Sequence, residues 1–367
     1  MAEEAVKKNI LKLVNLNLED KTALLQKNDV GYGHAQSILS YLSCFATVPP
    51  PKIWRNVKVW HYEGDIYYLP FKHRTDLGIF VNAHGKIIYG SRYFTTHLIN
   101  FSIAADRIIA SASTLNKDAA VNLNGIFIAI EKWYITYGHF KDEAFTLGAY
   151  LDDLGASASA KALLDYPTDS GLDTTSFTFN NNYCIIEDTI FNGRSVNVYN
   201  IEGECFRING LTLIENGFNG NGFHRFPNSV RDRIQSSATT KFPTSGIRKL
   251  FLTRSDSYRD PENKAEIDAY MRQNGFNVVN PENISYEAMI ALAASVEIVV
   301  MFYGSALTNM IYFAPNTRVI ILKSQSYMEE SINLWKKVID GYQLVVDVIP
   351  ARENRILMQE LSSSISS

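Results

Sequence analysis

A chain of 367 residues is long enough for about two domains of ordinary size. Its hydrophobic fraction of 46% and charged fraction of 20% are those of an ordinary soluble protein, which excludes wholesale disorder, a collagen-like repeat and a coiled coil. The 35 Lys and Arg residues are balanced by 38 Asp and Glu residues, which gives a net charge of −3. We therefore expect no nucleic-acid partner, because such proteins carry a basic excess.

The amino-terminal segment and the cysteines indicate the compartment. Residues 1–21 are charged and contain no long apolar run, which is not the pattern of a secretory signal. No stretch reaches the roughly 18 apolar residues of a transmembrane helix. The three cysteines, Cys44, Cys184 and Cys205, are far apart and form no paired motif, as is typical of a reducing compartment. We expect a cytoplasmic protein without a zinc site.

The first predicted elements are strands. Alternating apolar residues predict strands within residues 57–69 and 77–94. The dipeptides Glu63-Gly64 and His84-Gly85 predict a hairpin turn inside each segment. This part of the chain is therefore expected to form antiparallel structure.

A predicted helix over residues 138–155 follows the apolar segment 123–135. The small-residue run ASASAKALLDY after it predicts a second, short helix. The stretch that follows is rich in Asn, Gly and Asp and contains short predicted strands at 183–188, 196–201 and 205–208. Residues 215–226 have the composition of a linker. We therefore predict an irregular, strand-rich N-terminal domain over residues 1–215.

Strands and helices alternate regularly after about residue 245. The predicted strands lie within 248–253, 276–280, 296–302, 317–322 and 342–349, and the predicted helices within 261–275, 285–295, 305–314 and 328–340. Such alternation predicts a parallel sheet covered on both faces, as in a Rossmann-like domain. We place this domain at residues 216–340. The C-terminal segment 341–367 either packs on it or crosses back to the first domain.

A polar loop, Thr253–Asp256, follows the first strand of this sheet. Open parallel sheets bind ligands beyond the carboxyl ends of their strands, so Arg254 is a candidate phosphate contact. A surface ion pair is the alternative interpretation of the same arginine. The sequence contains neither GxGxxG nor GxxxxGK[ST], so the fingerprints of dinucleotide and P-loop sites are absent.

A second loop, Tyr303-Gly304-Ser305, follows the strand 296–302. Gly304 lets the backbone approach a ligand closely, and Ser305 is a candidate N-cap. The helix that follows would offer an anion its unpaired N–H groups, with Thr308 and Asn309 adding side-chain bonds. An ordinary tight turn with a helix cap is the alternative, since such caps occur in every protein.

The segment Tyr137–Glu143 carries a third candidate constellation. On a helix, His139 and Glu143 share one face, because residues four apart are neighbours. An imidazole and a carboxylate together suit general-base work, whereas a helix-stabilising pair is the alternative. A metal site would need a further ligand, and the spacing supplies none.

Taken together, four motifs in register resemble glycosyltransferase family 61. They are Tyr137–Glu143; Thr253-Arg254 followed by Arg259, Asn263 and Glu266; Gly275–Glu287; and Tyr303–Asn309. Their order and spacing agree over roughly residues 130–325. This sequence departs from the family pattern at two positions. Tyr303 stands where one form of the last motif has His, and Lys264 stands where the motif has the Glu of an Asn-Glu pair.

The resemblance implies an α/β fold of the GT-B type, with two Rossmann-like domains facing a cleft. It implies an inverting transferase that uses a nucleotide-sugar donor, UDP-linked in the characterised branches, and requires no metal. No separate cofactor is expected, because the nucleotide-sugar is a substrate. The absence of an N-terminal signal resembles bacterial members that act in capsule or lipopolysaccharide assembly. The acceptor is then an oligosaccharide or glycolipid, with peripheral membrane association through it.

The resemblance also assigns roles to residues. Glu143 is the expected base and His139 either its partner or a phosphate contact, with Asp142 an open alternative for the base. The expected donor-binding residues are Arg254, Gly304, Ser305, Thr308 and Asn309, and in second rank Tyr303, Asn263 and Glu287. Because of the departures at Tyr303 and Lys264, a non-catalytic sugar-nucleotide or glycan-binding protein of the same fold is the alternative. A different α/β enzyme with a phosphorylated substrate, such as an epimerase, is a further alternative.

Overall fold

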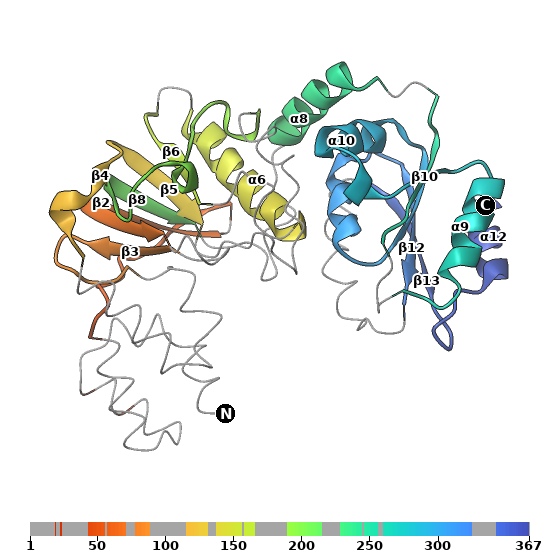
Figure 1. Ribbon diagram of the computed structural model, residues 1–367, viewed down its shortest axis with the longest axis horizontal. Helices are drawn as coiled ribbons and strands as arrows, with labels where there is room; N and C mark the ends of the chain where they lie inside the picture. Colours follow the sequence, from red (N-terminus) through yellow and green to blue (C-terminus); the bar gives the residue numbers. More distant parts are fainter. Residues whose placement is uncertain are drawn as a thin grey trace. The chain divides into compact units, whose positions relative to one another are not determined.

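A computed structural model shows two compact units that are interleaved in the sequence (Figure 1). The first comprises residues 1–135, 150–172 and 194–217, and the second comprises 136–149, 173–193 and 218–367. The structure describes residues 19, 23, 43–55, 57–70, 78–88, 115–130, 137–155, 158–165, 189–214, 228–243, 246–255, 260–324 and 343–366. The predicted strand 183–188, the linker 215–226 and the helix 328–340 lie outside these residues.

The first unit is built on a mixed sheet of eight described strands in the order β1-β2-β8-β5-β6-β7, with β3 beside β2 and β4 beside β8. Their bounds are β1 (Lys52–Trp54), β2 (Val57–Pro70), β3 (Gly78–Asn82), β4 (Val121–Asn122), β5 (Ile126–Ile130), β6 (Lys161–Leu164), β7 (Ser195–Asn197) and β8 (Phe206–Ile214). Strands β1, β3 and β8 pair antiparallel with β2, whereas β5, β6 and β7 continue the sheet from β8 in parallel. The strand-rich front of the chain therefore forms one sheet with both antiparallel and parallel pairs.

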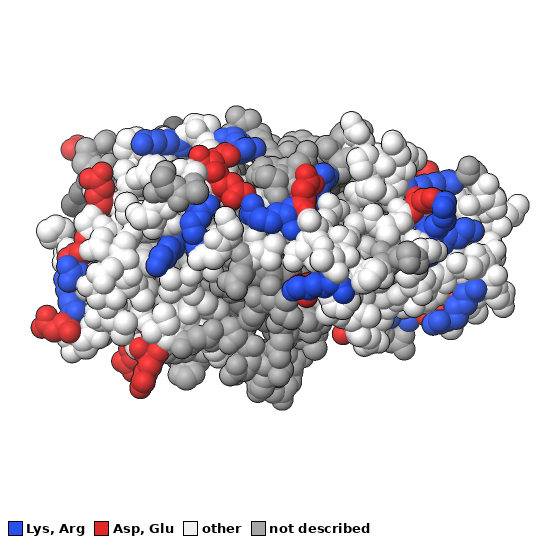
Figure 2. Space-filling view, turned by 90° about the horizontal axis from the view of Figure 1, so that it is seen from above, with Lys and Arg blue, Asp and Glu red and all other residues white. Residues whose placement is uncertain are grey.

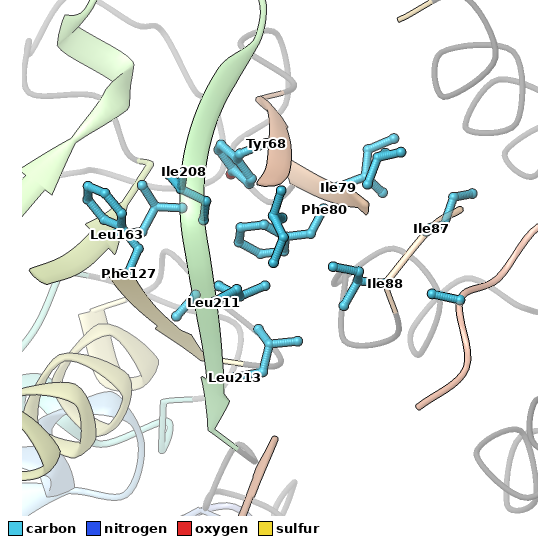
Figure 3. Packing of buried hydrophobic residues seen from close by; sticks show 14 of the residues in the cluster. Tyr68, Ile79, Phe80, Ile87, Ile88, Phe127, Leu163, Ile208, Leu211 and Leu213 are labelled. Atoms are coloured by element: carbon cyan, nitrogen blue, oxygen red, sulfur yellow. The ribbon is translucent and has the colours of Figure 1, made fainter. Parts of the chain in front are cut away.

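Side chains from several of these strands meet in one hydrophobic cluster (Figure 3). The rings of Tyr68 on β2 and Phe80 on β3 pack with their centroids 4.7 Å apart. Phe127 on β5 and Ile208 on β8 are fully buried. Burial of such large apolar side chains is the main favourable term in folding, so this cluster fixes the register of the sheet.

Two predictions for this unit are wrong. Strand β2 runs without a turn from Val57 to Pro70, and Glu63-Gly64 lies at a shift of the β2–β8 register, where Gly64 takes a φ of 83°. A β-bulge, like a hairpin turn, favours a glycine with a positive φ, so the Glu63-Gly64 dipeptide alone does not distinguish a bulge from a turn. The run ASASAKALLDY contains the buried strand β6, paired between β5 and β7, because tertiary pairing overrides the helix propensity of Ala and Leu. The turn at His84-Gly85 is confirmed.

His61 on β2 makes the stability of this unit depend on pH. Its Nδ1 lies 3.1 Å from Oγ1 of Thr212 on β8. Burial, and then the positive charge of Lys52, lower the pKa of His61 below its ordinary value of 6.5. The unfolded chain therefore binds the extra proton first, and the free energy of unfolding falls as the pH drops from 6.5 through the lower pKa of the folded state. Urea unfolding at about pH 5 and about pH 8 is expected to show a smaller difference for His61→Gln than for the wild type; equal differences would contradict this assignment.

The second unit contains a five-stranded, fully parallel sheet in the order β10-β9-β11-β12-β13. Its strands are β9 (Lys249–Leu252), β10 (Asn277–Val279), β11 (Ile298–Phe302), β12 (Arg318–Lys323) and β13 (Val345–Pro350). This confirms the predicted parallel sheet. The chain winds from β9 to β10 in one direction, and then crosses back to β11 on the other side of β9. The topological switch point, where such sheets bind ligands, lies between β9 and β11.

Helices cover both faces of this sheet (Figure 1). They are α8 (Asn228–Lys241), α9 (Lys264–Gln273), α10 (Tyr286–Ser295), the 3₁₀ helix η7 (Ser305–Tyr312) and α12 (Met358–Ser366). Buried residues of α9 and α12, among them Ile267 and Leu361, pack on Phe251 and Phe302 of the sheet. Helices α8, α10 and η7 contact one another. The sequence predicts α9, α10 and a helix at η7, whereas α8 and α12 are additional.

Helix α6 (Tyr137–Leu154) is shared between the two units, although it precedes the boundary predicted from the sequence. Its residues 137–149 belong to the second unit, because they contact η7 and the segment around Ile190. The ring of Phe145 lies 6.0 Å from that of Tyr312, the last residue of η7. At Gly148, an added Cβ would lie 2.9 Å from the carbonyl oxygen of Ile190. Arg233 of α8 donates a hydrogen bond to that same carbonyl at 2.8 Å. These contacts join α6, the segment around Ile190 and α8 within one unit.

Candidate functional site

Arg254 joins the two loops of the switch point. It follows β9, and its Nη1 donates a hydrogen bond at 3.2 Å to the carbonyl oxygen of Tyr303, which follows β11. Its Nε lies 2.5 Å from Oδ1 of Asp260, whose side chain is buried. The guanidinium also lies over the ring of Phe302, 5.4 Å from its centroid. Arg254 therefore does form an ion pair, with Asp260, as the alternative interpretation of this arginine expected. This ion pair holds the arginine at the ligand-binding edge of the sheet.

Gly304 forms the turn after β11. Its φ of 150° and ψ of −155° lie in a region that is essentially restricted to glycine. The N–H of Tyr303 bonds to the carbonyl of Leu322 on β12 at 2.9 Å, which extends the sheet up to the turn. The carbonyl of Gly304 then accepts the N–H of Leu307 at 3.0 Å and opens η7. The glycine therefore permits the sharp change from strand to helix.

We expect Gly304→Asn to lower the free energy of unfolding by about 1–3 kcal/mol, because a side chain is strained in this backbone conformation. Gly275 is the matched control. It follows α9 with a φ of 77°, a left-handed conformation that Asn tolerates. Urea unfolding of both variants measures the difference. Equal losses for Gly304→Asn and Gly275→Asn would show that the turn is not specially restricted.

Helix η7 starts directly at the turn, and it is a 3₁₀ helix of eight residues. As at any helix start, its first amides, those of Ser305 and Ala306, have no partner inside the helix. These N–H groups can therefore serve an anion. The side chains of Thr308 and Asn309 are buried, with exposed fractions of 3% and 0%. Their burial favours a supporting role beneath the turn.

Two second-rank residues have structural contacts of their own. Both ends of the Asn263 amide bind the backbone of Ile356, at 2.8 Å to its carbonyl and 3.0 Å from its N–H, which ties α9 to the C-terminal segment. The buried carboxylate of Glu287 on α10 accepts a hydrogen bond at 2.7 Å from Lys241 of α8. We therefore leave both residues out of the proposed ligand contacts. Tyr303 contributes its backbone, and its side chain is buried.

The first turns of α6 carry the remaining candidates. The structure confirms the predicted helix, which begins at Tyr137, so His139 and Glu143 lie on the same helix face. The side chains of residues 137–143 lie outside the described part of the structure. Residues 136–149 belong to the same unit as the switch point. The candidate base and the candidate phosphate contacts thus come from one unit.

Asp260 is the residue that the sequence interpretation missed. It stands before Pro261 at the approach to α9, where an aspartate is typical of an ordinary turn. Only the fold brings its carboxylate to Arg254, across a gap of six positions in the sequence. Lys264 is one of the two departures from the family pattern. Its Nζ lies 3.6 Å from Oδ2 of Asp268, and Oδ1 of the same carboxylate accepts a hydrogen bond from the Thr253 hydroxyl at 3.0 Å.

Among the described residues, no group of three or more His, Cys, Asp and Glu side chains could hold a metal ion. In the same part of the chain, no helix is both long and apolar enough to cross a membrane. On the face of the molecule in Figure 2, the described basic and acidic side chains are interspersed. Within either unit, the described residues on that face therefore form no continuous basic tract of the kind that binds a phosphate backbone.

Comparison with known proteins identifies the class of this fold and site. The family model described as Glycosyltransferase 61 matches residues 137–320, half of the chain. The match begins at the first residue of α6 and extends into β12, so it includes both switch-point loops. The chain is an enzyme that transfers a sugar from a donor to a glycan acceptor. It belongs to glycosyltransferase family 61, as its motifs indicate. No curated protein matches the chain.

Proposed function

We propose that the protein is an inverting, metal-independent glycosyltransferase of the GT-B type that uses a UDP-linked nucleotide-sugar as its donor. The observation that carries the proposal is the switch point, where Arg254 joins the loops after β9 and β11 and the amides of η7 begin. A guanidinium has five N–H donors, so its bonds to Asp260 and Tyr303 are compatible with a phosphate contact. These groups supply positive charge for a leaving diphosphate.

The proposed reaction is a single displacement at the anomeric carbon. The carboxylate of Glu143 takes the proton of the acceptor hydroxyl as the acceptor oxygen forms its bond to that carbon. The bond from the same carbon to the diphosphate oxygen breaks, and its electron pair leaves with the diphosphate. Arg254 and the N–H groups of Ser305 and Ala306 stabilise that charge. Attack opposite to the leaving group inverts the configuration. His139 assists as the partner of Glu143 or as a phosphate contact.

The biological setting is part of the same proposal. The acceptor is an oligosaccharide or glycolipid of surface polysaccharide biosynthesis, and the enzyme works in the cytoplasm, with peripheral membrane association through the acceptor. The donor side is built on residues 216–340 together with residues 136–149 and 173–193, which belong to the same compact unit. The rest of residues 1–215 is on the acceptor side, and 341–367 is a C-terminal segment. No separate cofactor takes part. This setting rests on the sequence pattern and on the family resemblance.

A thermal-shift screen tests the donor class. The nucleoside diphosphates UDP and GDP, CMP, and the corresponding nucleotide-sugars are added to the full chain. The proposal predicts that one nucleoside diphosphate raises the Tm, because ligand binding to the folded state stabilises it. Sugar transfer from that donor should continue in excess EDTA and give a product of inverted configuration. No stabilisation by any nucleotide, or activity that EDTA abolishes, would contradict the proposal.

A further inference from the structure

A polar cluster beside the switch point has no role in the transfer as proposed. We name Ser255, Asn280 and Glu282 the Glu282 cluster. Ser255 Oγ donates a hydrogen bond to Oε2 of Glu282, and Asn280 Nδ2 donates to Ser255 Oγ at 3.1 Å. Asn280 Oδ1 accepts the backbone N–H of Glu282 at 3.0 Å. These bonds hold the Glu282 carboxylate next to the loop that carries Arg254.

The cluster is exposed, and the fold gains little from it. Ser255 and Glu282 are both exposed to solvent. In the part of the chain that the structure describes, no Lys or Arg forms an ion pair with Glu282, in contrast to Glu287 and its partner Lys241. Holding a long exposed side chain in one rotamer costs conformational entropy. A fixed carboxylate with this exposure suits the recognition of a ligand that donates hydrogen bonds.

The order of the strands indicates which part of a ligand reaches the cluster. Ser255 follows β9, and Asn280 and Glu282 follow β10, which pairs with β9 on the side away from β11. Since neighbouring strands lie about 4.8 Å apart, the end of β10 is roughly 10 Å from the end of β11. A carboxylate repels phosphate oxygens, so Glu282 suits a neutral group attached to the phosphates. In doubly wound domains, an acidic residue further along the chain accepts a hydrogen bond from a ribose hydroxyl.

We propose that Glu282, positioned by Ser255 and Asn280, binds the ribose hydroxyls of the donor nucleotide. This inference rests on the proposed function, because it requires a nucleotide whose diphosphate lies at the switch point. Its carboxylate oxygens accept the hydroxyl hydrogens, while Arg254 and the η7 amides contact the diphosphate. The cluster then makes the enzyme selective for ribonucleotides over deoxyribonucleotides.

Calorimetric titration tests this selectivity. UDP, GDP and their 2′-deoxy forms are titrated into the wild type and into Glu282→Ala. The wild type is expected to bind the preferred ribonucleotide roughly tenfold more tightly than its 2′-deoxy form, as for a hydrogen bond to a charged acceptor. Glu282→Ala should bind the two forms with similar affinity, and its affinity for the 2′-deoxy form should match that of the wild type. Ser255→Ala should reduce the preference in part.

Glu297→Gln is the matched control. Glu297 is an exposed glutamate at the amino edge of the same sheet, where Arg248 donates to it at 2.6 Å. This variant should keep the full preference for the ribonucleotide. An unchanged preference in Glu282→Ala would overturn the inference and leave the proposed function standing. A wild type that binds none of the four nucleotides would overturn the proposed function and the inference with it.

Discussion

Glu143→Gln is expected to lower the turnover number for sugar transfer by about 10²- to 10⁴-fold, the usual contribution of a general base. Glutamine has the shape of glutamate and cannot accept the proton of the acceptor hydroxyl. The affinity for the nucleotide should change little, because the diphosphate contacts lie in other elements of the unit. Steady-state kinetics and the nucleotide-induced shift in Tm measure the two effects separately.

Asp142→Asn and His139→Ala are the matched variants on the same helix. Positions 142 and 143 are adjacent and so do not share a face of α6, whereas positions 139 and 143 are four apart and do share one. Asp142→Asn should retain most of the activity, and His139→Ala should lose an intermediate part of it. If Glu143→Gln turns over normally and Asp142→Asn is inactive, the base is Asp142.

Arg254→Ala is expected to weaken binding of the nucleoside diphosphate by roughly 10- to 100-fold, as for a lost hydrogen bond to a charged group. The value of kcat/KM should fall further, by about 10²- to 10³-fold, if the arginine also stabilises charge that develops on the leaving diphosphate. Arg254→Lys should restore little, since Lys cannot bridge Asp260 and the Tyr303 carbonyl with a planar fork. Calorimetry and kinetics measure both effects.

Arg318→Ala separates ligand binding from the loss of an ion pair. Arg318 at the start of β12 bonds to Asp347 on β13 at 2.7 Å, and its side chain is buried to nearly the same extent as that of Arg254. It lies at the amino edge of the sheet, away from the switch point. Arg318→Ala should lower stability and leave nucleotide affinity unchanged. Equal loss of affinity in both variants would show that Arg254 acts only through the fold.

Much of the second unit could be predicted from the sequence, because its signals are local. Pro261 and Gly275 bracket a helix, and the apolar runs on either side are short enough to be buried strands. The order of the strands could not be predicted in this way. It depends on which strands pack side by side, and it alone places the loops after β9 and β11 at the switch point.

The parts that the sequence did not show depend on contacts between distant residues. β6 is a strand because it pairs with β5 and β7, although its composition favours a helix. Asp260 contacts Arg254 only once β9 and the start of α9 are in place. The role of Glu282 likewise depends on the pairing of β9 with β10, which brings Ser255 next to Asn280.

Hydrogen exchange with and without the stabilising nucleoside diphosphate tests the central claim most directly. The account predicts slower amide exchange in peptides that contain the loop from Thr253 to Ser255 and the start of η7 from Gly304 to Leu307. Peptides at the amino edge of the same sheet, around Arg248 and Glu297, should be unaffected. Protection confined to other parts of the chain would contradict a donor site at the switch point.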